Sequence, residues 1–418
     1  MKKIIYALLT VVVMVPCFMF TAGAKDYNNS SHAAFKGGAC FQEYLVSEIL
    51  DFNKNIDVSA YVNHYGWNDT DVLSQVDSLI YNYPEVFALD VDFYEYFWDD
   101  YTGARWLKFN YIFSKGQYDN AKAKIDAEAD KILAMLDDSM TDAQKALVVH
   151  DYIVANTVYD MENDDKYTLY GCLGEGKAVC QGYSISFKYI MNLLGIDCYI
   201  VKSDEMWHTW NYIKLDGEYY HIDLVFDDPT VSENEKYYER TGQVNHNYFL
   251  ISDQKISSSH KNWHFYNDVK KATSTKYENY FWKNVNSQVI PQGNYLYYMD
   301  YEKKADNITA KLIRRNIKTN KIKTLCRVNS KWYKWEEDDY YFKSFACLSY
   351  YGERFYFNTS KRVYSVDING KDLKSVCKPK ITNGYLFGCY AGNNGKLLMC
   401  FMKDLDSVPV YKKKYLDK

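Results

Sequence analysis

Three residues that can act together in nucleophilic catalysis follow one another along the middle of the chain. Cys180 stands in the segment AVCQGY (178–183), His208 in WHTWN (207–211), and Asp223 at the end of YYHID (219–223). A thiol becomes a strong nucleophile when a base takes its proton and a third group orients that base. The three residue types in suitable local settings therefore predict acyl-transfer chemistry rather than binding alone.

The residues after Cys180 predict a helix that begins at or next to the cysteine. Apolar side chains recur at helical spacing from Tyr183 to Leu194, and Gly195 can end the helix. Unpaired backbone N–H groups at a helix start stabilise a thiolate and can donate to an oxyanion. This position favours a reactive thiol, whereas a cysteine without it is more often a small buried apolar residue.

The segments that carry His208 and Asp223 predict a β-hairpin. Two strand-like stretches, 207–215 and 218–226, are separated by Asp216-Gly217, which is a strong signal for a two-residue turn. In that register Trp210 faces Asp223, so His208 lies diagonally across from Asp223 on the same face. A three-residue turn would instead place the two side chains on opposite faces. The predicted register lets Asp223 orient the imidazole and leaves its other nitrogen for Cys180.

Two other arrangements of the same residues remain open. His221 is a rival base, because it shares the face of Asp223 and lies two residues before it on the same strand. A metal site of the Cys/His/His/Asp type is a second possibility, but the Cys-x-x-Cys or His-x-x-x-His spacing of zinc sites is missing. We therefore predict no metal and no cofactor.

Other conspicuous stretches are expected to have structural roles rather than catalytic or ligand-binding ones. The glycine-rich segment 171–176 lacks the Gly-Lys-Ser/Thr ending of a phosphate loop, which argues against nucleotide binding. Asp227-Asp228-Pro229 is expected to form a polar turn after the second strand. Four aromatic residues are expected to form cleft walls and core rather than a cofactor site: Trp207, Trp210, Tyr219 and Tyr220.

The regions on either side of this stretch differ in character. Helical spacing predicts helices over 41–50, 71–81, 118–136 and 142–157, the last with a capping box of Thr141 and Gln144, and alternation predicts a strand over 106–113. From 277 to 418 a unit of short aromatic strands and turns recurs, starting near Gly293, Gly352 and Gly384. Three such units resemble β-propeller blades but fall short of a closed propeller, so we expect a partial arrangement of antiparallel sheets.

Composition and the N-terminus limit the partners. The net charge of -4 offers no basic excess for phosphates, so no nucleic-acid partner is expected. Lys2 and Lys3 precede an apolar stretch over 4–20, and Ala-Gly-Ala (22–24) fits a cleavage site, which predicts an export leader over 1–24. No second long apolar run follows. The mature chain is thus expected to be secreted or at the cell surface, without a membrane span.

Ten cysteines leave the disulfide pattern open. Nine remain after cleavage of the predicted leader, and export permits disulfides. An odd number leaves at least one free thiol, which we expect to be Cys180. The other eight can pair or stay as buried thiols.

Together these motifs resemble the transglutaminase-like superfamily. The resemblance covers about 141–230 and is carried by GKAVCQGYS (176–184), HTWN (208–211) and DGEYYHID (216–223) with DDP (227–229). It implies Cys180 as nucleophile, His208 as base and Asp223 as orienting acid. Thr209 stands where alanine is usual. The family's second oxyanion donor, an upstream aromatic or amide side chain, is not identifiable, and Tyr167 and Tyr170 are the candidates.

The resemblance also implies an architecture. We expect an α+β fold in which a helix bearing the cysteine packs on an antiparallel sheet, followed by an all-β repeat region. The expected divisions are the leader 1–24, a mixed region 25–140, a catalytic domain 141–265 and a repeat domain 277–418. The region 41–140, with YPEVF (83–87), resembles the N-terminal part of exported bacterial members.

The implied activity is that of a cysteine enzyme acting on protein or peptide amide bonds through a thioester. An amine acceptor would give cross-linking, and water would give amidase or peptidase action. The expected partners are proteins or peptides, including those of the cell surface or cell wall, and the chain is expected to be a monomer. The alternative from another class is a catalytically silent surface protein that binds protein or glycan.

Overall fold

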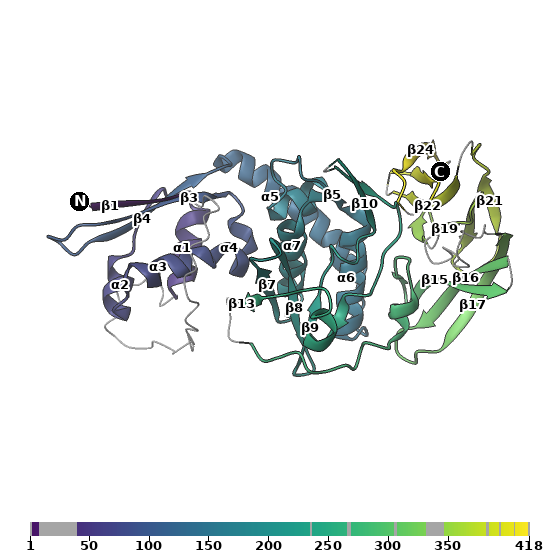
Figure 1. Ribbon diagram of the computed structural model, residues 1–418, viewed down its shortest axis with the longest axis horizontal. Coiled ribbons are helices and arrows are strands. Elements are labelled where there is room, and N and C mark those ends of the chain that lie inside the picture. Colours follow the sequence, from purple (N-terminus) through teal and green to yellow (C-terminus); the bar gives the residue numbers. More distant parts are fainter. Residues whose placement is uncertain are drawn as a thin grey trace.

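The computed structural model describes residues 2–7, 40–234, 236–265, 269–304, 307–331, 347–381, 384–392, 394–404 and 406–416. The described chain runs along the long axis of the molecule, with the N-terminal region at one end and the C-terminal β region at the other (Figure 1). Most of the predicted leader lies outside the described residues. Its start, Lys2–Ala7, is strand β1, which pairs with β3.

The N-terminal region combines short helices with one antiparallel sheet. Its elements are α1 (Phe41–Leu50), β2 (Asn55–Asp57), α2 (Ser59–Tyr65), α3 (Asp69–Asp77), α4 (Leu79–Asn82), a 3-10 turn (Pro84–Val86), β3 (Leu89–Trp98), β4 (Arg105–Tyr111) and α5 (Lys115–Ala134). The sheet order is β1-β3-β4-β2.

The predicted helices of this region form, with two differences. The helix predicted over 71–81 is divided at Ser78 into α3 and α4. The Ser78 hydroxyl donates to the carbonyl of Gln75 at 3.2 Å, a local bond that competes with the helical ladder. Helix α5 begins three residues earlier than predicted, because Ser114 and Gln117 form a capping box.

The central region holds a five-stranded sheet, a helix packed on it and a second helix packed on the first. Its elements are α6 (Asp142–Asn156), β5 (Val158–Tyr159), a π-helical turn (Tyr170–Gly174), β6 (Lys177–Ala178), α7 (Cys180–Leu193), β7 (Cys198–Ser203), β8 (His208–Leu215), β9 (Glu218–Ile222), β10 (Thr230–Glu233), β11 (Lys236–Glu239), β12 (Phe249–Ile251), α8 (Asp253–Ile256) and β13 (Trp263–Phe265). The sheet order is β12-β9-β8-β7-β13, and every neighbouring pair is antiparallel.

Helix α7 lies between this sheet and helix α6. It contacts β7, β8 and α6, and its fully buried Phe187, Ile190 and Met191 belong to a core shared with both. The mixed helix and strand content and the cysteine-bearing helix on an antiparallel sheet agree with the α+β expectation. The division of the chain into domains stays a prediction.

The C-terminal region consists of three antiparallel sheets. They are β14 (Ile290–Gln292), β15 (Tyr295–Lys304), β16 (Asn307–Asn316) and β17 (Ile322–Lys331); β18 (Ser349–Tyr351), β19 (Arg354–Asn358), β20 (Val363–Asp367) and β21 (Lys374–Cys377); and β22 (Tyr385–Ala391), β23 (Lys396–Met402) and β24 (Val410–Tyr415). Each repeated unit thus corresponds to one sheet. The described strands form no closed barrel or propeller, and the likeness to propeller blades is unconfirmed.

The described residues bear on two further expectations, the state of the cysteines and the lack of a membrane span. The nine described cysteines are all free thiols, of which six are buried, whereas Cys40 is exposed and Cys326 and Cys377 are partly exposed. Within the described ranges, no helix has both the length and the apolar character needed to span a bilayer.

Candidate active site

Cys180 is the first residue of helix α7. The N-cap residue is Val179, which has no side chain able to cap the helix. The N–H groups of the first turn have no intrahelical acceptors, so they are available to an anion. Gly182 permits the close approach of the preceding loop, because a Cβ there would lie 2.6 Å from the carbonyl oxygen of Lys166.

The hairpin that carries the other two residues has the predicted register. Leu215 pairs with Glu218, and Asp216 and Gly217 both have positive φ, at 53° and 82°, as a two-residue hairpin turn requires. His208 opens strand β8 and Asp223 follows strand β9. The Nε2 of His208 lies 2.6 Å from the Oδ2 of Asp223. The structure therefore brings these two side chains together as the sequence predicted.

The thiol and the imidazole form a polar pair. Burial alone would raise the pKa of the Cys180 thiol, but its hydrogen bond with His208 and the charge of that ring outweigh burial and lower the pKa. Burial alone would lower the pKa of His208, but the Asp223 carboxylate raises it to about 10. These directions favour a thiolate beside an imidazolium near neutral pH. Because Nε2 is bound to Asp223, Nδ1 is the nitrogen left for the thiol.

Hydrogen bonds fix helix α7 to strand β8 next to this pair. The Ser184 hydroxyl lies 2.7 Å from the carbonyl oxygen of Cys180 and 3.0 Å from that of Thr209. The amide of Asn211 donates to the carbonyl of Ser184 at 2.8 Å. All of these groups are buried. The cysteine and the histidine are thus held in place by contacts between their own elements.

Comparison with known proteins agrees with this geometry. Residues 129–224 match the model of the transglutaminase-like superfamily. The chain carries a transglutaminase-like domain. One similar solved structure is described as "Crystal structure of a TGase"; the match has 19% identity and a TM-score of 0.23, and covers 29% of this chain and 40% of that one. The chain thus spans less than half of that protein. No curated protein matches the chain.

A second histidine, which lies outside the matched residues 129–224, contacts Asp223. The Nε2 of His260, a buried residue after α8, lies 2.8 Å from the same Oδ2 that binds His208. The other oxygen accepts the backbone N–H groups of Val225 and Phe226. Burial would raise the pKa of Asp223, but His208 outweighs it and holds the pKa far below its usual range. The sequence analysis missed His260, which has no spacing signal relative to the other three residues.

A tyrosine that the sequence analysis also missed lies beside the thiol. Tyr159 ends strand β5, which pairs in parallel with β6 just before Cys180. Its backbone N–H donates to the carboxylate of Glu239 at 2.9 Å. Burial, and then the charge of the nearby Cys180, raise the pKa of the Tyr159 phenol well above its usual value, so it stays protonated. Within the described part of the chain its hydroxyl has no hydrogen-bond partner, which leaves it free to donate.

The two tyrosines that the sequence suggested as oxyanion donors, Tyr167 and Tyr170, make contacts away from the thiol. Tyr170 is buried, and its hydroxyl accepts a hydrogen bond from Lys124 at 2.8 Å. Tyr167 is exposed, and its carbonyl oxygen accepts the side-chain amide of Gln181 at 3.1 Å. Neither contact directs a phenol toward the Cys180 thiol, so Tyr159 is the better placed donor.

The rival base His221 is occupied by structural contacts. Its Nδ1 accepts the indole N–H of Trp210 at 2.9 Å, and its Nε2 lies 2.8 Å from Asp253. Burial lowers the pKa of His221. Both ring nitrogens are therefore engaged away from Cys180, and the ring is held neutral.

The Asp227-Asp228 turn is buried rather than exposed. Asp227 accepts the backbone N–H of Tyr248 and lies 3.4 Å from the Nε2 of His150. Asp228 accepts the hydroxyl of Tyr183 at 2.7 Å. The expectation of a polar turn holds for the backbone. It was wrong for the surroundings, because partners distant in the sequence bury both carboxylates.

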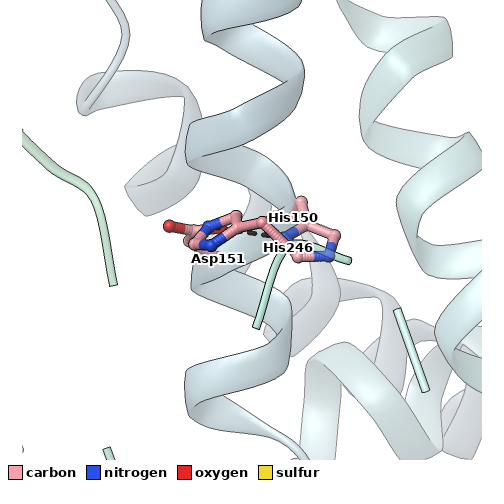
Figure 2. A group of neighbouring side chains, drawn as sticks. All are labelled: His150, Asp151 and His246. Carbon is pink, nitrogen blue, oxygen red and sulfur yellow. Dashed lines mark hydrogen bonds and ion pairs between the residues drawn. The ribbon is translucent and has the colours of Figure 1, made fainter. Parts of the chain in front are cut away.

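His150 belongs to a second group of buried histidine and aspartate side chains. Figure 2 shows His150 and Asp151 on helix α6 beside His246. The Oδ1 of Asp151 lies 2.8 Å from the Nδ1 of His150 and 2.9 Å from the Nε2 of His246. Burial alone would lower the pKa of His150, but Asp151 and Asp227 raise it to about 9. This group is called the buried quartet below: His150, Asp151, Asp227 and His246.

Two sets of side chains could in principle hold a metal ion. They are His150, Asp151 and His246, and His208, Asp223 and His260, each with ligand atoms within 4.8 Å of one another. In both sets one carboxylate oxygen lies within hydrogen-bond distance of two imidazoles. Hydrogen bonding therefore accounts for the approach of the groups without a metal. The alternative Cys/His/His/Asp set does not assemble among the described residues, because His221 turns to Trp210 and Asp253.

Proposed function

We propose that this protein is a transglutaminase-like cysteine enzyme that acts on carboxamide or peptide bonds through a thioester. The observation that carries the proposal is a series of hydrogen bonds from Cys180, the first residue of helix α7, to His208 and from His208 to Asp223. A thiolate, an adjacent imidazolium and a buried carboxylate are the groups that acyl transfer needs.

In the first half of the reaction, the Cys180 thiolate attacks the carbonyl carbon of the substrate. The His208 imidazolium then gives its proton to the leaving nitrogen as the C–N bond breaks. Ammonia or an amine leaves, and a thioester to Cys180 remains. Asp223 keeps the imidazole oriented through the hydrogen bond to Nε2, so that Nδ1 faces the reacting atoms.

The tetrahedral intermediate carries a negative charge on the former carbonyl oxygen. The backbone N–H groups of the uncapped first turn of α7 are one source of donors. We assign the hydroxyl of Tyr159 as the side-chain donor, since it lies beside Cys180, stays protonated and has no partner among the described residues.

In the second half, a nucleophile attacks the thioester carbon while His208 accepts its proton, and the Cys180 thiolate leaves. A lysine amine would give an isopeptide cross-link, and water would give hydrolysis. The substrates are proposed to be proteins or peptides. If the predicted leader acts as one, the enzyme works outside the cell or at its surface, where cell-surface and cell-wall peptides are available.

The test begins with the thiol. We expect iodoacetamide at pH 7 to label Cys180 first, because its lowered pKa supplies thiolate at this pH. The His208→Ala variant should react about 100-fold more slowly at this cysteine, and Cys180→Ala should lose the labelled peptide in mass spectrometry. The half-buried His264 serves as the matched control, because His264→Ala removes an imidazole on strand β13 that lies 3.8 Å from the Asp204 carboxylate.

Labelling spread over several cysteines and unchanged in His208→Ala would contradict the proposal and favour the silent binding protein. Turnover is tested next with a glutamine peptide and an amine donor. Incorporation of the amine identifies a transferase, and release of ammonia alone identifies an amidase.

A further inference from the structure

Four large aromatic side chains with more than a third of their surface exposed come from four separate segments of the transglutaminase-like region. They are called the aromatic rim here: Tyr167, Trp207, Phe226 and Tyr237. Single exposed apolar residues are normal on a protein surface, so only their grouping is informative. The rim residues lie as far as 70 positions apart along the chain, so the fold and not the local sequence groups them.

Two rim residues lie beside the thiol and its base. The carbonyl oxygen of Trp207 is 4.0 Å from the Sγ of Cys180. The ring of Phe226 is 5.2 Å from the ring of His208, centroid to centroid. The ring of Phe226 therefore lies next to the base, and the backbone of Trp207, whose side chain is exposed, lies next to the thiol.

The other two rim residues lie beside the proposed oxyanion donor and the residue next to the nucleophile. The ring of Tyr237 packs edge-on against Tyr159 at 4.7 Å. The carbonyl of Tyr167 is bound by the side chain of Gln181, which follows Cys180. The ring of Tyr237 thus lies next to the proposed oxyanion donor, and the backbone of Tyr167 is bound to the residue that follows the nucleophile.

Trp207 is held in an unusual backbone conformation. Its φ is 51°, in the left-handed region that a bulky residue rarely adopts. The indole is 68% exposed, the most of the rim residues, although strand β8 begins at the next residue. Backbone strain of this kind persists mainly at functional sites. Burial of the ring does not explain this conformation, and the exposed indole is available to a ligand.

The charged groups beside the rim are paired within the protein. Lys236 lies 3.5 Å from Glu162, and Lys202 lies 3.0 Å from Asp204. The ammonium of Lys166 is 5.2 Å from the ring centroid of Tyr167. The rings, rather than these charges, are the groups most available to a ligand.

We propose that the aromatic rim binds large apolar or aromatic side chains of a peptide acyl donor, next to its reacting carboxamide. The inference rests on the proposed function, which places a peptide carbonyl at Cys180. Trp207 and Phe226 contact the substrate on the side of the base, and Tyr167 and Tyr237 contact it on the side of Tyr159. Rings of this size gain affinity by burying apolar area and by edge or stacked contacts with other rings.

Binding to the Cys180→Ala protein tests the rim without requiring turnover. Two glutamine peptides of equal length are compared, one with phenylalanine and one with serine on both sides of the glutamine. We expect the phenylalanine peptide to bind about tenfold more tightly. Adding Trp207→Ala or Tyr237→Ala should reduce this ratio toward one. Leu193→Ala, which removes a half-exposed apolar side chain at the far end of α7, should leave the ratio unchanged.

The ratio of the two affinities separates recognition from damage, because a disturbed site weakens both peptides together. Equal affinity of the two peptides would overturn the rim proposal. Tighter binding of an N-acetylglucosamine oligomer than of either peptide would overturn it in favour of a glycan. Turnover by the wild-type protein is measured in parallel. A retained affinity ratio without any turnover would contradict the proposed enzyme and leave the rim as a peptide-binding surface.

Discussion

At the scale of single residues, the reactivity of Cys180 depends on the charges beside it more than on its exposure. The thiol is only 9% exposed, and burial by itself would keep it protonated. The imidazole of His208 reverses this effect. Its own charge is sustained by Asp223, which also receives hydrogen bonds from two backbone N–H groups and lies 2.8 Å from His260. A single buried carboxylate therefore supports the whole series.

Tyr159 provides a residue-scale prediction. Tyr159→Phe removes the hydroxyl that we assign to the oxyanion and keeps the ring against Tyr237. We expect kcat for a glutamine peptide to fall by about 100-fold or more, with little change in KM. Alkylation of Cys180 by iodoacetamide should change by less than about twofold, because that displacement forms no oxyanion.

The control for this substitution is Tyr170→Phe. Its hydroxyl is bound to Lys124 and should not affect the acylation step. If Tyr159→Phe slowed alkylation as much as acylation, the tyrosine would be positioning the thiol rather than stabilising the oxyanion. A pH profile of alkylation distinguishes these roles, since only a positioning role would shift the pKa of Cys180.

At the scale of elements, local signals were enough to predict the helix that begins at Cys180 and the hairpin that joins His208 to Asp223. Both depend on short-range chemistry, namely helical spacing after the cysteine and the positive φ that Asp216-Gly217 tolerates. Tyr159, His260 and the buried surroundings of Asp227 were missed. Their contacts join elements distant in the sequence, and no local pattern specifies such packing.

Gly182 provides a prediction at this scale. Its hydrogen faces the loop before α7, and a Cβ would lie 2.6 Å from the Lys166 carbonyl oxygen and 2.7 Å from the Ala178 side chain. Gly182→Ala must displace the loop or the helix start, so we expect a loss of about 1–3 kcal/mol in the free energy of unfolding. Activity should fall with it, because Cys180 lies on the same turn.

The matched control is Gly116→Ala, in the first turn of α5, where nothing lies within 4 Å of an added Cβ. It should raise the free energy of unfolding by about 0.5–1 kcal/mol, since alanine favours the helix. Urea titration of both variants measures the difference. A stable and fully active Gly182→Ala protein would show that the loop moves without cost.

At the scale of the whole molecule, the buried quartet joins the active-site region to the segment that leads into the C-terminal sheets. The Oδ2 of Asp151 accepts the backbone N–H of Val289 at 2.6 Å, and the Nδ1 of His246 lies 2.8 Å from the carbonyl oxygen of Val285. Asp227 donates its backbone N–H to the carbonyl of Asp223. The catalytic loop and the start of the β region are therefore connected through four buried charged or polar side chains.

The quartet should make stability depend on pH in a specific direction. Burial alone would lower the pKa of His150, but Asp151 and Asp227 raise it from 6.5 to about 9. Because the pKa of His150 is higher in the folded than in the unfolded protein, protonation of this ring stabilises the fold. The stabilisation is fully present below pH 6.5 and disappears as the pH rises through 9. The difference in unfolding free energy between wild type and His150→Gln should therefore shrink by about 3 kcal/mol from pH 6.5 to pH 9.5.

The two proteins are compared at each pH, because Lys283, whose pKa burial lowers to about 8, titrates in the same range in both and cancels in the difference. His264→Gln is the control, since burial lowers the pKa of His264 and its contribution should be flat over this range. A His150→Gln difference that is equally flat would show that His150 is neutral in the folded protein and that the quartet contains no buried imidazolium at this position.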